Sequence, residues 1–455
     1  MENNKKKKID MTTGHIMTKV ILFALPIIIG NVLQQLYTTV DTLVIGNYCG
    51  HTSLAAVGTS SQPVEVLLCV FLGIGTGVSI LVSQYAGAKE EDKVISVAKT
   101  ATSLIFIVGV PIAVIGWFFT PFMLDFMNVP EDTWNAALVY TRVIFLGTLG
   151  NLGYNMNAGI LRGLGDSKAS LWFLVVSGIV NVVLDIVLVA YVGMDVSGAA
   201  LATTIAMCTS WIVSIIYIKT KFSNLKFTFL PSYLSIKMLK RILSIGLPIG
   251  LNNSLYSFGH VALQTLVNAN GSVFMAGVSV AGRITGCSNI AITGLSSAST
   301  TFSGQNFGAK KYKRLKEGHL RIPVSSGLIT LIFGIFFIFI HKPILKYFTK
   351  DEMVLMYASR QVVIMLLSQW FYAIFNSIIC IVNGIGKVRY TTVVNILMLW
   401  AVRIPSAYLI CKFFDGTWVM LCFPISFCFA MICMVSYYIL SKDWRDIMKL
   451  AENEA

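Results

Sequence analysis

Charged residues are scarce in this sequence, and their scarcity limits what the chain can be. Asp, Glu, Lys and Arg make up 12% of its 455 residues, whereas soluble globular proteins carry roughly a quarter. Apolar residues make up 56%, and the mean hydropathy is +0.75. A surface with so few charges cannot lie entirely in water, which excludes a soluble protein and favours a membrane protein.

Several stretches lack Asp, Glu, Lys and Arg altogether, and they predict the fold class. Each is longer than the roughly 20 residues that a membrane-spanning helix needs. Because hydrocarbon offers the backbone no hydrogen-bond partner, a spanning segment has to be helical. The sequence therefore predicts an all-α polytopic membrane protein from the stretches 100–124, 196–218, 284–309, 361–386 and 416–441.

Cysteine pairs with the spacing of metal ligands are also absent. Most of the nine cysteines lie within apolar runs, where cysteine behaves as a small buried apolar residue: Cys69, Cys208, Cys380, Cys422, Cys428 and Cys433. No CxxC pair indicates a metal or redox centre, and we expect no cofactor.

The basic residues predict the orientation of the chain. The amino-terminal tail, the even-numbered connections and the carboxyl-terminal tail hold 27 of the 35 Lys and Arg residues, and the odd-numbered connections hold four. This asymmetry follows the positive-inside rule, so both termini should face the cytoplasm of an inner (plasma) membrane. The orientation in the membrane then explains the net charge of +14, and nucleic acid is not an expected partner. Twelve helices are expected, near 20–48, 54–85, 96–120, 133–161, 169–192, 197–219, 242–268, 274–304, 319–341, 353–383, 390–411 and 416–440.

Internal repetition shows that the chain has two related halves. Three short motifs recur 221 or 222 residues apart: Leu25-Pro26 and Leu247-Pro248; residues 84–89 and 305–310; and residues 162–166 and 383–387. Six helices per half is an even number, so both halves insert the same way up, as parallel repeats. Two such lobes can rock against each other around a central cavity, which is the geometry of alternating access.

The repeat also predicts the domain boundaries. We expect a basic cytoplasmic tail over 1–19, an N-lobe of six helices over 20–219, and a cytoplasmic linker over 220–241. A C-lobe of six helices should follow over 242–440, with a cytoplasmic tail over 441–455.

The motifs together resemble the multidrug and toxic compound extrusion (MATE) family. They comprise Leu25-Pro26 with Gln34, Tyr37 and Asp41, the segment after the second helix, residues 159–163, residues 181–185, and the echoes in the second half. The resemblance implies the MATE fold, with twelve transmembrane helices in two pseudo-symmetric six-helix lobes. It also implies efflux of amphipathic, often cationic, drug-like molecules, driven by entry of H⁺ or Na⁺, and we expect a monomer in the bilayer.

The carboxylates point independently to a cation site. A carboxylate in the bilayer core costs at least ~2.5 kcal/mol, and only Asp41, Glu65 and Asp185 lie well inside expected helices. Asp41 and Asp185 should lie at similar depth in one lobe, with Asn181 on the same helix face as Asp185 and Thr203 at matching depth. Such a set of oxygens suits Na⁺, and two close carboxyl groups can also hold a proton. The alternative is that both acids only accept hydrogen bonds from neighbouring polar side chains.

The resemblance assigns these residues to one branch of the family. Asp41, Asn181, Asp185 and Thr203 match the N-lobe cation site of the prokaryotic DinF-like branch. The repeat maps Asp41 to Ala262 and Asp185 to Ser406, so the C-lobe lacks these acids. The NorM-like branch uses C-lobe carboxylates that this sequence does not have, which favours the DinF-like reading.

Five further residues are expected to line the substrate cavity. Gln34, Tyr37 and Asp41 recur at helical spacing and form one polar stripe, which must face protein or water. Pro26 removes a backbone donor from the first helix and favours a bend there. Asn157 and Met207 should line the N-lobe further, since methionine suits adaptable pockets.

Glu65 and Arg283 form a candidate gate pair. The repeat maps Arg283 to Gln62, one helical turn from Glu65, so the two charges could meet across the cavity. Two separately exposed residues are the alternative. His260 and Arg403 are expected to make structural polar contacts.

Two other functions compete with drug efflux. A flippase for lipid-linked sugars should line its cavity with several basic residues, and only Arg283 and Arg403 are available. An integral membrane enzyme that modifies lipids would need a catalytic cluster at the membrane surface, and none is evident, so no enzyme activity is expected. A channel would leave the intramembrane carboxylates unexplained.

Overall fold

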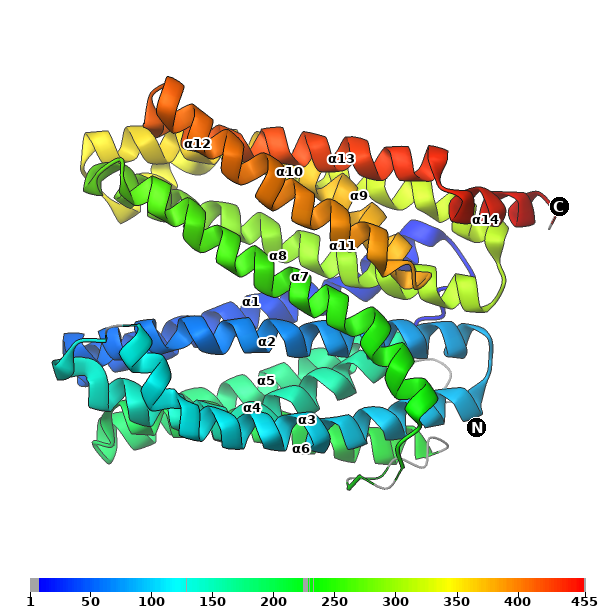
Figure 1. Cartoon of the computed structure of the whole chain (residues 1–455), viewed down its shortest axis with the longest axis horizontal. Coiled ribbons are helices and arrows are strands. Elements are labelled where there is room, and N and C mark those ends of the chain that lie inside the picture. The colour runs from blue at the N-terminus through cyan, green and yellow to red at the C-terminus, as the bar shows by residue number, and fades with distance from the viewer. Residues whose placement is uncertain (1–7, 128, 224–227, 229, 232, 454–455) are drawn as a thin grey trace. The chain divides into compact units, whose positions relative to one another are not determined.

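The computed structural model of this chain describes residues 8–127, 129–223, 228, 230–231 and 233–453. Within this part the regular structure is entirely helical (Figure 1). Lys5, Lys6 and Lys7 of the expected basic tail lie outside the described residues. The helices are α1 (Ile16–Tyr48), α2 (Gly50–Gly87), α3 (Glu91–Phe126), α4 (Glu131–Gly163), α5 (Ser167–Asp185), α6 (Asp195–Lys221), α7 (Ile236–Asn268), α8 (Ser272–Gly308), α9 (Tyr312–Phe348), α10 (Glu352–Gly384), α11 (Val388–Ile396), α12 (Ile404–Phe413), α13 (Cys422–Leu440) and α14 (Lys442–Glu452).

Each expected transmembrane helix has a counterpart, and most extend a few residues further at both ends. Two are interrupted by π-helical turns: Ile186–Tyr191 follows α5, and Leu397–Arg403 joins α11 to α12. A short 3₁₀ segment, Gly416–Leu421, leads into α13. Among the described residues, ten helices are long and apolar enough to span a membrane, so the chain is an all-α, multi-pass membrane protein.

Ten is fewer than the twelve spans expected, and α7 and α8 account for the difference. Both are as long as the other helices, but their mean hydropathy is too low for them to be counted among the ten. The reason is composition: α7 carries Asn252, Asn253, His260 and Gln264 within its length, and α8 is rich in Gly, Ser and Thr. Polar helices of this kind can still lie in a membrane when protein or water covers their polar faces.

The chain divides into two compact units, and the boundaries between them fall within α1 and within α7. The first unit contains residues 1–9 and 25–251, and the second contains residues 10–24 and 252–455. Thus α1 passes from the second unit to the first just before Pro26, and α7 passes from the first to the second a few residues after Pro248. These units are defined by packing and not by the repeat, so the expected boundaries at 20, 219, 242 and 440 stay a prediction.

In the first unit, α4 lies against α2, α3 and α6, and α5 packs on α6. Glycines allow these helices to approach closely, as is common where lipid gives no hydrophobic drive for helices to associate. The tightest approach joins α2 to the first half of α7. A Cβ placed on Gly73 would lie 2.2 Å from the backbone nitrogen of Gly250, and one on Gly77 would lie 2.8 Å from that of Gly246. Only glycine fits these positions.

In the second unit, α10 lies against α8, α9 and α13. The expected C-terminal tail forms α14, which packs on α9. Trp444 of α14 is 1% exposed and stacks on Tyr438, with a distance of 4.5 Å between ring centroids. Ion pairs from Lys316 to Glu452 (3.2 Å) and from Lys387 to Asp443 (2.9 Å) hold the same helix.

Residues 10–13 form a docked segment, although the sequence predicted a basic tail over 1–19. Met11 is completely buried. Its backbone N–H donates to Oε1 of Gln305 (3.0 Å), and its carbonyl accepts from Nδ2 of Asn306 (3.1 Å). Gln305 and Asn306 belong to the motif that recurs in both halves, so in the second unit this motif holds the amino-terminal segment.

Candidate functional site

Three helices of the first unit bring the predicted cation-site residues together. Asp41 comes from α1, Asn181 and Asp185 from α5, and Thr203 from α6. The carboxyl groups of Asp41 and Asp185 lie close enough for each to influence the charge of the other. Asn181 reaches across to α6, where its Nδ2 lies 3.5 Å from Oγ1 of Thr203. Asp185 is completely buried and Asn181 is 2% exposed.

The backbone changes form directly at this site. The regular part of α5 ends at Asp185, and the π-helical turn Ile186–Tyr191 follows. Such turns are rare and occur frequently at functional sites. Beyond the carboxyl groups, Val44, Ile45, Val189 and Ala199 form a buried apolar cluster, which keeps water from that side of the pair.

The two carboxyl groups have few other partners. Oδ1 of Asp41 and both carboxyl oxygens of Asp185 are buried and accept no hydrogen bond from another group in the described part of the chain. Two carboxylates cannot hydrogen-bond to each other unless one of them carries a proton. The arrangement can therefore hold a proton between two acids, or offer several oxygens to a small hard cation.

Two tyrosines complete the surroundings. Tyr37 of α1 interacts with Gln34 and lies near Asp41, and its ring packs against Gly178 of α5, where an added Cβ would lie 3.1 Å from it. Tyr140 of α4 is close enough to both acids to interact with them electrostatically. The sequence analysis did not predict a role for Tyr140. Its helical spacing to Ile144, one turn later on the buried face of α4, indicates only that the side chain points into the unit.

The remaining predicted lining residues take different positions. Gln34 is exposed and Pro26 is buried. Asn157 is 1% exposed and donates to Oγ of Ser214 on α6 (2.8 Å). The sulfur of Met207 accepts from Nδ2 of Asn151 (3.7 Å). Contact of these residues with a substrate stays a prediction.

The candidate gate residues lie in different units. Glu65 is exposed on α2 of the first unit, and Arg283 is exposed on α8 of the second. The side chain of Gln62, to which the repeat maps Arg283, lies outside the described part. The proposed pairing of Glu65 with Arg283 stays a prediction.

The second unit contains a buried cation. Arg403 is completely buried; its Nε donates to Oγ of Ser426 and its Nη1 to the hydroxyl of Tyr256, both at 2.9 Å. The guanidinium also lies 4.4 Å from the ring centroid of Phe423 and 4.9 Å from that of Phe427. These contacts agree with the expected structural role of Arg403. No cluster of three or more His, Cys, Asp or Glu side chains suited to a metal ion occurs in the described part.

Comparisons with known proteins agree with this architecture. The family model described as MatE matches the chain twice, over residues 26–187 and 248–409. The probable multidrug resistance protein YoeA of Bacillus subtilis is 30% identical over 92% of each chain. DNA damage-inducible protein F of Escherichia coli is 26% identical over 77% of each chain. A crystal structure of MATE in complex with MaD3S superposes with a TM-score of 0.87 at 22% identity, covering 98% of this chain and 99% of the other.

Proposed function

This chain belongs to the MatE family of membrane transporters, which are not enzymes, and we propose that it is a secondary active multidrug efflux antiporter. Its substrates would be amphipathic, often cationic, small molecules, exchanged for H⁺ or Na⁺. Curated relatives are named as multidrug resistance proteins, which supports drug-like substrates. We further propose that it acts as a monomer in the plasma membrane, with both termini in the cytoplasm.

One observation carries the proposal of ion coupling: the adjacent carboxyl groups of Asp41 and Asp185. An acid within a membrane helix is costly and marks an ion or proton pathway by default. Asp185 is completely buried and Asp41 is half-buried, and among the described residues no donor reaches Oδ1 of Asp41 or either carboxyl oxygen of Asp185. A structural role alone would be served by hydrogen-bond donors around each acid, as Asp166 has elsewhere in the same unit.

The geometry supports a proton as the coupling ion with the least rearrangement. Two neighbouring acids hold one proton between them more readily than two full negative charges, so uptake and release of a proton can occur at this pair. Sodium coupling would place the ion among the oxygens of Asp41, Asp185, Asn181 and Thr203, after the Asn181 amide turns from its contact with Thr203. A cation site in this half, with no acid at Ala262 or Ser406, supports the DinF-like branch.

The test is efflux from proteoliposomes in which pH and Na⁺ gradients are imposed separately. A cationic dye such as ethidium serves as the probe. If the proposal is right, one of the two gradients drives ethidium against its own concentration gradient. Equal dye movement with and without either gradient would contradict antiport.

The energised site has its own test, Asp41→Asn in the same vesicles. The variant should insert and fold but lose uphill transport. Uphill transport at the wild-type rate would place the coupling site elsewhere in the chain.

A further inference from the structure

The segment that leads into α7 carries exposed apolar side chains beside exposed cations. Tyr233, Leu234 and Ile236 are 49%, 40% and 64% exposed, and Lys237 and Lys240 are also exposed. All five belong to the linker anchor, residues 233–241, which lies wholly in the first unit. We propose that the linker anchor lies in the headgroup layer of the bilayer and binds anionic phospholipids there.

Two hydrogen bonds to α3 fix the depth of the linker anchor. Oγ of Ser103 donates to the carbonyl of Tyr233 (2.8 Å). The backbone N–H of Ser235 donates to Oγ1 of Thr100 (3.3 Å). The charge-free run of α3 begins at Thr100, directly after Lys99. Because charges are costly inside the bilayer, a spanning helix enters the hydrocarbon where its charged residues end. The linker anchor therefore lies at the level at which α3 enters the bilayer.

The same two bonds allow an irregular backbone to lie at this level. Residues 233–235 are not helical, and backbone groups without partners are costly away from water. The side chains of Thr100 and Ser103, which are 0% and 2% exposed, supply a partner for one carbonyl and one N–H. The carbonyl of Ser235 accepts from the N–H of Leu239 (2.8 Å), in the first turn of α7. These backbone groups are thus paired within the protein and do not depend on water.

The exposed side chains are of the kinds that suit a membrane interface. Tyrosine is enriched there because its ring is apolar and its hydroxyl is polar. Leu234 and Ile236 present apolar surface that water disfavours. A lysine can lay its apolar stem along such surface while its ammonium group reaches the polar layer. The charges exclude the hydrocarbon core and the apolar side chains disfavour bulk water, so the headgroup layer fits both.

No acidic residue neutralises the two lysines. The sequence contains no Asp or Glu from residue 196 to residue 316, and no ion pair in the described part of the chain involves Lys237 or Lys240. Both lie near the start of α7, whose first turn contains no acid, although the amino-terminal end of a helix favours negative charge. A lipid phosphate supplies the negative charge that this helix start lacks.

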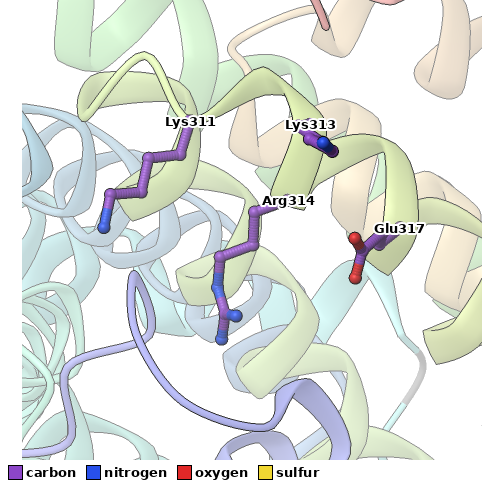
Figure 2. Close-up of a pocket in the computed structure, with 4 residues that line it drawn as sticks. All are labelled: Lys311, Lys313, Arg314 and Glu317. Carbon is purple, nitrogen blue, oxygen red and sulfur yellow. The ribbon is translucent and has the colours of Figure 1, made fainter. Parts of the chain in front are cut away.

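Other cations differ from these lysines because the protein itself holds them. Arg241, also in the linker anchor, donates to the hydroxyl of Tyr85 on α2. In the second unit, Lys311 and Arg314 at the start of α9 donate to backbone carbonyls of the amino-terminal segment (Figure 2). The linker anchor is therefore the basic surface that we assign to lipid.

The experiment measures where residue 234 lies and which lipids surround it, and it does not depend on transport. The full-length protein is reconstituted in nanodiscs of phosphatidylcholine and phosphatidylglycerol, so that both membrane surfaces are accessible. An environment-sensitive fluorescent amino acid replaces Leu234 in one protein and Asp92 in the control. Asp92 is exposed on α3, eight residues before Thr100, which places it about 12 Å further out along the helix axis. Iodide quenches a fluorophore in water, whereas lipids spin-labelled near the glycerol quench one in the interface.

We expect iodide to quench the fluorophore at residue 234 at least about threefold less than at residue 92. Spin-labelled phosphatidylglycerol should quench it more than spin-labelled phosphatidylcholine at equal mole fraction, by up to about fivefold for each lysine that binds a headgroup. Lys237→Gln combined with Lys240→Gln should abolish this preference. Lys442→Gln, which removes an exposed cation on α14, should preserve it.

Either half of the proposal can fail separately. Iodide quenching at residue 234 as strong as at residue 92 would overturn the placement in the bilayer and favour a soluble partner for this surface. Equal quenching by the two spin-labelled lipids, with both lysines present, would overturn anionic lipid as the ligand.

Discussion

Replacing Asp185 with asparagine tests separately what the carboxyl pair does to the stability of the protein and what it does for ion-coupled efflux. The carboxyl of Asp185 is completely buried, and the neighbouring Oδ1 of Asp41 accepts a hydrogen bond from no donor among the described residues. In Asp185→Asn the new amide can donate to Asp41 without a shared proton. Satisfying a buried acceptor of this kind contributes about 1 kcal/mol. For a domain of roughly 150–250 residues, that shifts Tm by about 2–4 °C.

We therefore expect Asp185→Asn to unfold at the same temperature as the wild-type protein or a few degrees above it, while ethidium efflux against its gradient falls to the level of protein-free vesicles. Thermal unfolding of the purified protein, followed by intrinsic tryptophan fluorescence, gives the first quantity. The proteoliposome assay gives the second.

Asp166→Asn is the matched control, because Asp166 is equally buried in the same unit but fully partnered. It accepts from the backbone of Ala169 (3.2 Å) and from the hydroxyl of Tyr217 (2.7 Å), and it lies 3.8 Å from Nζ of Lys221. This control should lose stability and keep coupled efflux, the opposite of Asp185→Asn. A fall in Tm for Asp185→Asn as large as that for Asp166→Asn, with uphill efflux intact, would refute the reasoning that the pair is functional.

Three further predictions follow from particular contacts. Gly73→Ala places a methyl group 2.2 Å from a backbone nitrogen of α7 and should sharply lower Tm or expression, whereas Gly282→Ala, whose Cβ would meet nothing within 4 Å, should be neutral or stabilising by about 0.5–1 kcal/mol. Arg403→Lys keeps the charge but cannot reach Ser426 and Tyr256 together, so Tm should fall by several degrees while the ion dependence of efflux persists; a loss of ion dependence with unchanged Tm would contradict a structural role. Burial raises the pKa of Asp10, but hydrogen bonds from Thr12 and Thr13 and the charge of Lys311 outweigh it, so its pKa lies below 3.8. The ionised carboxylate then supports the amino-terminal segment above pH 3.8 and loses this effect as pH falls through the lowered pKa, which should appear as faster hydrogen exchange of the Thr12 amide and be absent in Asp10→Asn.

Local patterns in the sequence determined the class of fold. Hydropathy and the absence of charge identify membrane helices because every spanning segment must satisfy its own backbone in lipid. The repeated motifs, such as Gln305-Asn306, identified the two halves because they recur at one spacing. Mean hydropathy alone does not identify α7 and α8 as membrane spans, since polar residues such as Asn252 and Gln264 lower the hydropathy of a helix whatever surrounds it.

The candidate site was predictable in its members but not in its contacts. Depth along the helices placed Asp41 and Asp185 at one level, and helical spacing placed Asn181 beside Asp185. Depth does not determine how each helix is rotated about its axis. That rotation depends on packing such as that of Tyr37 against Gly178, and it brings the two carboxyl groups near each other.

Only the tertiary structure decided contacts between segments that are far apart in the chain. Met11 looks like one apolar residue in a polar tail, and its burial depends on Gln305 and Asn306, almost 300 residues away. Arg403 likewise gains its aromatic surroundings from α7 and α13, which no local pattern links to it. Periodicity reports which face of a helix is buried, whereas the partner on that face is determined by how all the helices of a unit pack together.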